Sequence, residues 1–179
     1  KEMCMATAER TGVYKVRNNP LTLLGNEIKV GQKAPNFSLA AANNQMVSLD
    51  GSKGKTRIIA AVASLDTGVC DMESKKLNDI AKEMPNVEIL VVSKDLPFAQ
   101  ARWCGANSVQ NIKTASAYRD DSSFPTDYGI LVKENRLLAR SVFVIDGNDV
   151  VRHVQYVSDL LGEPDYAAVK EAAKNAAGA

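Results

Sequence analysis

"RIIAAVASLDTGVCDMESKKLNDIAKEMPNVEILVVS", residues 57–93, predicts a strand, a helix and a second strand. Residues 57–63 and 86–93 are short apolar runs of the kind found in strands that are buried on both faces. The apolar residues between them recur at the i, i+3, i+4 and i+7 spacing of one helix face: Leu77, Ile80, Ala81 and Met84. We therefore expect two parallel strands joined by a right-handed helical crossover.

The segments on both sides of this unit predict hairpins, short strands and two more helices. The expected elements are a hairpin at 12–25 with its turn at 18–20, strands at 37–39 and 46–49, a helix at 97–106, a hairpin at 141–157 and a helix at 165–176 that covers the sheet. Residues 107–135 are polar and irregular. This order indicates an α/β fold with a mixed central sheet flanked by helices and an N-terminal β-hairpin. At 179 residues, we expect one domain over residues 1–179.

Composition and charge argue against several classes of partner. The chain has 22 Lys and Arg against 21 Asp and Glu, a formal net charge of +1. Such a chain gives no electrostatic reason to bind nucleic acid or an anionic membrane. No run reaches the roughly 18 apolar residues of a membrane span, and "KEMCMATAER" at the start is too short and polar for a signal peptide. We expect no nucleic acid, no membrane and a cytoplasmic location, with the periplasm as the alternative.

The cysteine and histidine content narrows the possible chemistry. Cys4, Cys70 and Cys104 are too few and too widely spaced for a secreted disulfide scaffold. The chain has a single histidine, His153, and no CxxC motif, so we expect no metal site. Mechanisms that pair histidine with a serine or cysteine nucleophile would have to use His153. We interpret His153 as a surface or packing residue on a strand, and Cys4 as incidental.

Cys70 lies at the start of the predicted helix. It stands seven residues before Leu77 and therefore shares the core-facing stripe, while Thr67 occupies the N-cap position. This spacing imitates a capping box with a thiolate in place of the usual Glu, and the acidic Asp71 and Glu73 that follow suit a helix start. From position alone, Cys70 is equally well interpreted as a small buried residue or as a reactive thiolate. A catalyst would also need a cation and a hydrogen-bond donor near the sulfur.

Three blocks of the sequence resemble the thiol peroxidases, the bacterial Tpx branch of the peroxiredoxins. They are "SLDTGVC" at 64–70, "SKDLPFAQARWCGA" at 93–106 and "LLARSVFVID" at 137–146. The likeness extends over nearly the whole chain, including the N-terminal hairpin and "VGQKAPNFSL". A Thr-x-x-Cys motif alone would be weak, whereas three blocks in the right order with two cysteines are specific.

The resemblance implies a thioredoxin-like fold and four catalytic residues. Cys70 matches the peroxidatic cysteine, which attacks a peroxide oxygen and becomes a sulfenic acid. Cys104 matches the resolving cysteine, which condenses with that sulfenic acid to form an intramolecular disulfide. Thr67 matches the threonine whose hydroxyl contacts the thiolate and the peroxide. Arg140 matches the arginine that holds the thiolate and polarises the substrate.

The resemblance also implies an activity and partners. A protein of this kind is an atypical two-cysteine peroxiredoxin, a thiol-dependent peroxidase that acts on hydrogen peroxide and organic (alkyl) hydroperoxides in antioxidant defence. Thioredoxin is the expected reductant of the disulfide, and no cofactor is expected. Homodimers that pack close to the active site are usual in the family.

Ala63 departs from the family pattern. The signature is Pro-x-x-x-Thr-x-x-Cys, and Ala63 occupies the proline position. In the family this ring shields the cysteine from water and shapes the turn, so the alanine puts the rate in question more than the identity. Two alternatives stay open. One is a redox sensor that reacts slowly and passes its oxidation to a partner protein, and the other is a thioredoxin-like disulfide oxidoreductase, against which the lack of CxxC argues.

The two cysteines are expected on separate helices. A disulfide needs sulfur atoms about 2 Å apart and α-carbons within about 7 Å. We therefore predict local unfolding of a helix turn around Cys70, Cys104 or both before the bond forms. Trp103, next to Cys104, is interpreted as a residue that anchors its helix in the core.

Overall fold

The computed structural model describes residues 6–178, so the interpretation of Cys4 lies outside the described residues. The strands are β1 (Glu9–Val16), β2 (Asn19–Leu24), β3 (Ser38–Ala40), β4 (Met46–Ser48), β5 (Thr56–Ala61), β6 (Val87–Ser93), β7 (Lys113–Ser116), β8 (Leu131–Val132), β9 (Ser141–Ile145) and β10 (Val151–Tyr156). The helices are α1 (Gly68–Glu83), α2 (Pro97–Ala106), α3 (Phe124–Asp127) and α4 (Tyr166–Ala177), with 3-10 turns η1 (Ala42–Asn44) and η2 (Asp50–Ser52). Between residues 6 and 178, no helix has the length and apolar character needed to cross a membrane.

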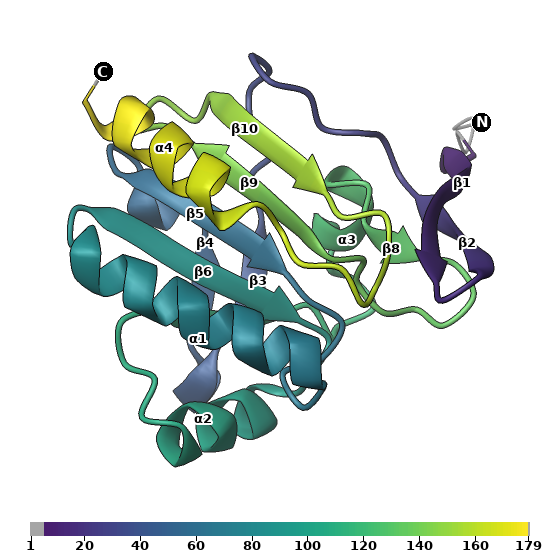
Figure 1. Ribbon diagram of the computed structural model, residues 1–179, viewed down its shortest axis with the longest axis horizontal. Helices are drawn as coiled ribbons and strands as arrows, with labels where there is room; N and C mark the ends of the chain where they lie inside the picture. The colour runs from purple at the N-terminus through teal and green to yellow at the C-terminus, as the bar shows by residue number, and fades with distance from the viewer. Residues whose placement is uncertain (1–5, 179) are drawn as a thin grey trace.

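The predicted strand–helix–strand unit is confirmed at the centre of the fold. β5 and β6 are parallel neighbours in a seven-stranded mixed sheet of order β10-β9-β5-β6-β7-β3-β4, and α1 connects them (Figure 1). Both strands are almost wholly buried. Ala61, the last residue of β5, pairs with Val92 of β6 and with Ser141 of β9. The carboxyl ends of β5 and β6 therefore meet the amino end of β9 at one end of the sheet.

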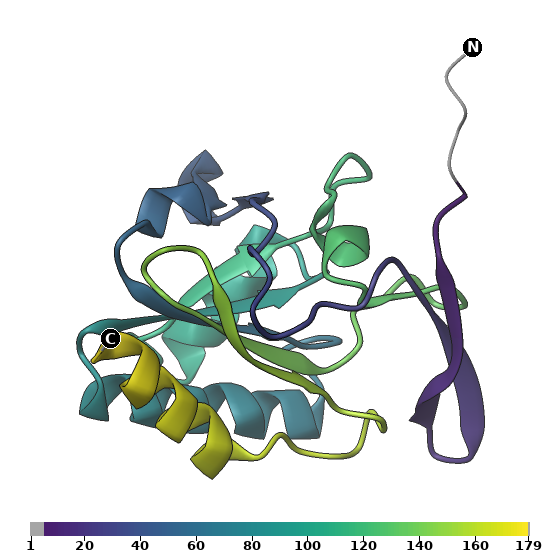
Figure 2. The same ribbon diagram turned by 90° about the horizontal axis from the view of Figure 1, so that it is seen from above.

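Helices and turns cover both faces of the sheet. α1 and α4 lie side by side on one face, while α3 and the 3-10 turns lie on the other (Figure 2). The apolar stripe predicted for α1 is buried in the core between α1, α4 and the sheet: Leu77, Ile80, Ala81 and Met84. The prediction that the last helix covers the sheet is also confirmed, since α4 packs on β9 and β5. Trp103 of α2 is buried in this same core, as predicted.

The N-terminal hairpin lies at the side of the molecule, where β1, β2 and β8 form a separate three-stranded sheet (Figure 1). The expected turn at 18–20 is displaced, because β2 already begins at Asn19. Arg17 makes the turn with a left-handed φ of 56°. Pro20 pairs with Lys15 of β1, but β8 on the other side of β2 reaches only Leu23 and Leu24, so that edge of the strand is free at the proline.

The prediction that residues 107–135 hold no regular element is wrong. This segment contains β7, α3 and β8. Each has four residues or fewer, which is too short for apolar periodicity to reveal. It contributes aliphatic and aromatic residues to the core, among them Phe124 and Tyr128, which pack edge-on against Phe37 with ring centroids 5.2 and 6.0 Å apart. The segment is therefore fixed by contacts with residues far away in the chain.

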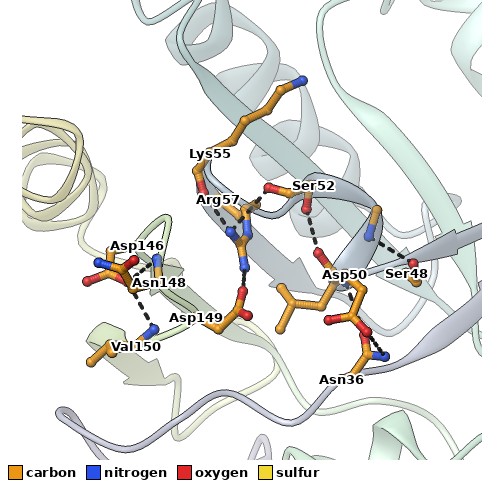
Figure 3. Close-up of polar contacts among 12 residues, drawn as sticks. Asn36, Ser48, Asp50, Ser52, Lys55, Arg57, Asp146, Asn148, Asp149 and Val150 are labelled. Atoms are coloured by element: carbon orange, nitrogen blue, oxygen red, sulfur yellow. Dashed lines mark hydrogen bonds and ion pairs between the residues drawn. The ribbon is translucent and has the colours of Figure 1, made fainter.

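A buried ion pair fixes the end of the sheet opposite Ala61 and Ser141. Arg57, near the start of β5, donates to the Asp149 carboxylate and to the carbonyl oxygens of Ser52 at 3.2 Å and Lys55 at 2.7 Å (Figure 3). Asp146 accepts from two backbone amides of the same β9–β10 turn. These contacts attach the β9–β10 turn to the loop that leads into β5.

Candidate active site

Cys70 is the third residue of α1, as predicted, and its side chain is fully buried. Its sulfur accepts a hydrogen bond from Arg140 Nη2 at 3.3 Å. Arg140 immediately precedes β9, and the pairing of β9 with β5 brings it to the start of α1. The Arg140 guanidinium thus places a positive charge on the sulfur, next to the unpaired amides of the helix start. The fold thus brings two of the four predicted site residues into direct contact.

Two further partners orient the Arg140 guanidinium. Nη1 donates to the Glu73 carboxylate, and Nη2 donates to the carbonyl oxygen of Leu160 at 2.9 Å in addition to the Cys70 sulfur. A guanidinium presents its donors in a rigid planar fork, so contacts on two sides leave little freedom of rotation. Glu73 and the segment after β10 therefore keep one N–H group of Arg140 directed at the Cys70 sulfur.

Glu73 is a site residue that the sequence reasoning missed. It is fully buried with its carboxylate on Arg140, and its Oε1 atom has no hydrogen-bond partner among the described residues. Burial raises the pKa of Glu73 from 4.5 to about 7, although the positive charge of Arg140 acts in the opposite direction. Its i, i+3 spacing from Cys70, which places both on one face of α1, is the signal that could have found it.

Glu73 should give the stability of the protein a characteristic pH dependence. Between pH 4.5 and about 7, the folded protein keeps a proton that the unfolded chain has released. The free energy of unfolding therefore falls as the pH rises through this range. We expect a decline of up to about 3 kcal/mol, and a much smaller decline in Glu73→Gln. Urea unfolding of both proteins from pH 4.5 to 8 measures the difference.

Other groups near Glu73 do not produce the same fall in the free energy of unfolding with rising pH. The charged or titratable groups around the Glu73–Arg140 pair are Tyr14, Cys70, Glu163 and Tyr166. The pKa of Glu163 is lowered, chiefly by hydrogen bonds from Lys76 and Tyr166, and Arg140 stays charged. Glu83→Gln, at the exposed end of α1, is the matched control and should keep the wild-type slope. Equal slopes in wild type and Glu73→Gln would contradict the prediction.

Thr67 occupies the N-cap position of α1, as predicted, but its hydroxyl does not cap the helix. Oγ1 donates instead to the carbonyl oxygen of Ser64 at 3.0 Å. The expected capping box is therefore wrong, because the hydroxyl closes the preceding turn. The structure does not bring this hydroxyl to the Cys70 sulfur, where Arg140 is the donor.

Cys104 lies near the end of α2, half-buried, and both Cys104 and Cys70 are free thiols. Burial raises the pKa of the Cys104 thiol, although the Thr114 side chain of β7 acts in the opposite direction. The Cys70 sulfur, by contrast, is held by Arg140. A disulfide between the two cysteines would require the Cys70 sulfur to be released from this contact.

Comparison with known proteins identifies the family. The sequence pattern of the redoxin family, described as Redoxin, matches residues 29–170. A thiol peroxidase from Halalkalibacterium halodurans is 53% identical over 160 residues, covering 89% of this chain and 96% of the relative. The chain belongs to the redoxin family, among its thiol peroxidases. A thiol peroxidase from Bacillus subtilis is 46% identical over 158 residues, covering 88% of this chain and 94% of the relative.

Solved structures share the fold of this thiol peroxidase. A peroxiredoxin-like protein from Aquifex aeolicus is 40% identical, with a TM-score of 0.85 over 94% of this chain and 98% of its own. A thiol peroxidase from Chromobacterium violaceum has a TM-score of 0.82 over 90% and 95% of the two chains, and at 18% identity it supports the fold alone. The thioredoxin-like fold expected from the sequence is confirmed.

The loop before Thr67 is anchored by Asp95, the second residue after β6. Ser64 Oγ donates to Asp95 Oδ1 at 2.7 Å, and the Leu65 amide donates to Oδ2 at 2.8 Å. Ala63, at the position where the thiol peroxidase signature has proline, is buried directly before this anchored pair. Asp95 therefore restrains the turn that leads into α1 without a proline ring.

The N-terminal hairpin of the thiol peroxidase reaches the site through Tyr14. Burial raises the pKa of this side chain to about 12, although the positive charge of Arg140 acts in the opposite direction, so it remains neutral. Lys15 exchanges backbone hydrogen bonds with Ser158 and Leu160, at 2.9 and 3.0 Å. The hairpin thereby holds the segment whose Leu160 carbonyl contacts Arg140.

His153 lies away from this chemistry, on β10. It is partly buried, and its Nε2 atom lies 2.8 Å from Nε2 of Gln155, which agrees with its interpretation as a packing residue. In the part of the chain from residue 6 to 178, no cluster of three or more His, Cys, Asp or Glu could hold a metal ion.

Proposed function

We propose that this thiol peroxidase reduces hydrogen peroxide and organic hydroperoxides at Cys70, in antioxidant defence. The Cys70 thiolate attacks one peroxide oxygen, the O–O bond breaks, and the attacked oxygen stays on the sulfur as a sulfenic acid. The other oxygen takes up a proton and leaves as water or an alcohol. The observation that carries the proposal is the 3.3 Å contact between Arg140 Nη2 and the Cys70 sulfur in a fully buried cluster.

Arg140 would assist this step in two ways. A cation on the sulfur favours the thiolate, and its N–H groups can stabilise the negative charge that develops on the leaving oxygen. The low dielectric of the buried site strengthens both effects. We propose Thr67 as a second contact for the peroxide, which requires its hydroxyl to turn away from the Ser64 carbonyl toward the sulfur.

We propose that Cys104 completes the turnover. Its thiolate attacks the sulfenic sulfur of Cys70, the S–O bond breaks, and hydroxide leaves and takes up a proton to become water as the S–S bond forms. Thioredoxin, a dithiol, then reduces the disulfide by exchange and is itself oxidised. The packing of both cysteines against the same apolar core supports an intramolecular pairing.

We further propose a homodimer in the cytoplasm. The exposed apolar side chains of Leu96 and Phe98, at the start of α2, support an interface on this side of the molecule. A cytoplasmic location suits an enzyme whose cysteines must return to thiols, because thioredoxin systems keep that compartment reducing. Sedimentation velocity of wild type and Phe98→Ser tests the interface, and a monomeric wild type would contradict it.

The test of the peroxidase function follows the sulfur atoms of the wild-type protein. Reduced protein is mixed in stopped flow with hydrogen peroxide or an alkyl hydroperoxide, quenched with acid, alkylated and mapped by mass spectrometry. We expect one equivalent of peroxide to yield a Cys70–Cys104 disulfide, and continuous turnover with thioredoxin, thioredoxin reductase and NADPH. Thiols left unmodified by peroxide would overturn the proposal. A disulfide that thioredoxin does not reduce would overturn the choice of reductant alone.

A redox sensor is the second candidate, favoured by the complete burial of Cys70 and by Ala63. A buried sulfur that peroxide reaches slowly suits a protein that passes its oxidation to a partner. The same stopped-flow experiment separates the two functions. A rate constant close to that of a free cysteine thiolate favours the sensor, whereas one larger by orders of magnitude favours the peroxidase.

A further inference from the structure

The residues next to the two cysteines are joined to each other. Trp103, which precedes Cys104, donates its Nε1 proton to Oδ1 of Asp71, which follows Cys70, at 3.0 Å. The second carboxylate oxygen of Asp71 accepts from Lys75 Nζ at 2.8 Å within α1. The indole ring is buried in the core shared by both helices. This hydrogen bond therefore holds the end of α2 against the first turn of α1.

An ion pair joins the same two segments but is weaker. Arg102 Nη2 lies 3.6 Å from the carboxylate of Asp66, in the loop before α1, and both side chains are largely exposed. Exposed ion pairs contribute little to stability. The bond from the buried indole of Trp103 to the ionised Asp71 is charge-assisted and partly shielded from water, so it is the stronger of the two links.

We propose that the Trp103–Asp71 hydrogen bond is a latch that sets the rate of disulfide formation between Cys70 and Cys104. This inference rests on the proposed peroxidase function. With the latch closed, Cys70 stays on Arg140, in position for peroxide, and α2 keeps Cys104 packed against β7. With the latch open, the end of α2 separates from α1 and β7, and the Cys104 sulfur reaches the sulfenic sulfur. Trp103 and Asp71 are positioning residues, because neither contacts the substrate or the reacting sulfurs.

The latch also controls a competing oxidation. A sulfenic acid that persists can attack a second peroxide, which oxidises the sulfur to a sulfinic acid and is itself reduced to water or an alcohol. A closed latch prolongs the lifetime of the sulfenic acid and thus exposes Cys70 to this reaction. An open latch shortens that lifetime and protects the enzyme at high peroxide concentration.

Variants on both sides of the bond test the latch. Trp103→Phe removes the donor and keeps an aromatic ring in the core. Asp71→Ala removes the acceptor, and Asp71→Asn keeps an acceptor oxygen without the charge. Asp79→Ala is the matched control, because Asp79 is an exposed acidic residue of the same helix that pairs with Lys82.

Each reduced variant is mixed with hydrogen peroxide and quenched at intervals, and mass spectrometry counts thiol, sulfenic acid, disulfide and sulfinic acid. We expect Trp103→Phe and Asp71→Ala to form the disulfide about five- to tenfold faster than wild type, with less sulfinic acid at high peroxide. The first oxidation step of Trp103→Phe should keep its wild-type rate constant. Asp71→Asn should lie between wild type and Asp71→Ala, and Asp79→Ala should match wild type. Trp103 is the sole tryptophan, so its fluorescence follows the opening independently in the Asp71 variants.

Disulfide formation at the wild-type rate or slower in both Trp103→Phe and Asp71→Ala would overturn the latch. The latch would also be overturned if the acceleration in the double variant Trp103→Phe/Asp71→Ala were the product of the accelerations in the two single variants. Two residues that share one bond are not independent, so removing both should have little more effect than removing one. A wild-type protein whose Cys70 is never oxidised would instead overturn the peroxidase function. Formation of the disulfide at unaltered rates in all variants would leave the peroxidase function standing and remove the latch alone.

Discussion

Replacing Cys70 with serine is expected to abolish peroxide consumption, both in a single turnover and in the presence of thioredoxin. Serine fits the fully buried position, but its hydroxyl is not ionised at neutral pH, so Arg140 has no anion to hold and no nucleophile results. We expect the loss to exceed about a thousandfold, down to the background reaction. Stopped-flow mixing of reduced protein with hydrogen peroxide measures it.

Cys104→Ser is the matched control, because it makes the same chemical change at the other cysteine. This variant should consume one equivalent of peroxide at the wild-type rate and then stop, since its sulfenic acid has no thiol partner within the chain. Full activity of Cys70→Ser would refute Cys70 as the nucleophile. Unimpaired cycling of Cys104→Ser with thioredoxin would refute Cys104 as the resolving residue.

The parts of this site that could be predicted depend on strong local patterns. The helical spacing counted back from Leu77 places Cys70 in the first turn of α1, and it lies there. The apolar runs of β5 and β6 likewise predict their parallel pairing. The sequence indicates Arg140 as a site residue only through the family resemblance. Its contact with Cys70 depends on the pairing of β9 with β5, which no local pattern near either residue indicates.

Glu73 and Thr67 show why the rest could not be predicted. An acidic residue near a helix start satisfies a local rule, so nothing in the surrounding sequence indicates that Glu73 is buried against an arginine from another strand. Thr67 satisfies the N-cap preference by residue type, but the Ser64 carbonyl competes for its hydroxyl. Leu160 contributes a backbone carbonyl to Arg140. Every residue has such a carbonyl, so the residue type at this position does not indicate the contact.

Arg140→Met is expected to slow the first oxidation step by about a hundredfold to a thousandfold. Methionine fills much of the volume but leaves the Cys70 sulfur and the leaving oxygen without a cation. It also leaves the Glu73 carboxyl buried without its partner, and breaking a buried pair from one side costs about 3 to 5 kcal/mol. The rate constant for Cys70 oxidation and the free energy of unfolding must therefore be measured together, by stopped flow and by urea titration.

Two companion variants separate the loss of rate from the loss of stability. Arg57→Met removes another fully buried arginine, which pairs with Asp149 (Figure 3). Arg57 lies at the opposite end of the β5–β9 pair from Arg140, about 13 Å away along the strands. This variant should lose comparable stability and keep the wild-type oxidation rate.

The double variant Arg140→Met/Glu73→Gln removes the carboxylate that Arg140→Met leaves unpaired, so it should regain part of the stability and none of the rate. Recovered rate in the double variant, or equal slowing in Arg57→Met, would mean that Arg140 acts by supporting the fold. Slow oxidation in a double variant that has regained stability would mean that Arg140 acts by stabilising the negative charge on the reacting sulfur and oxygen.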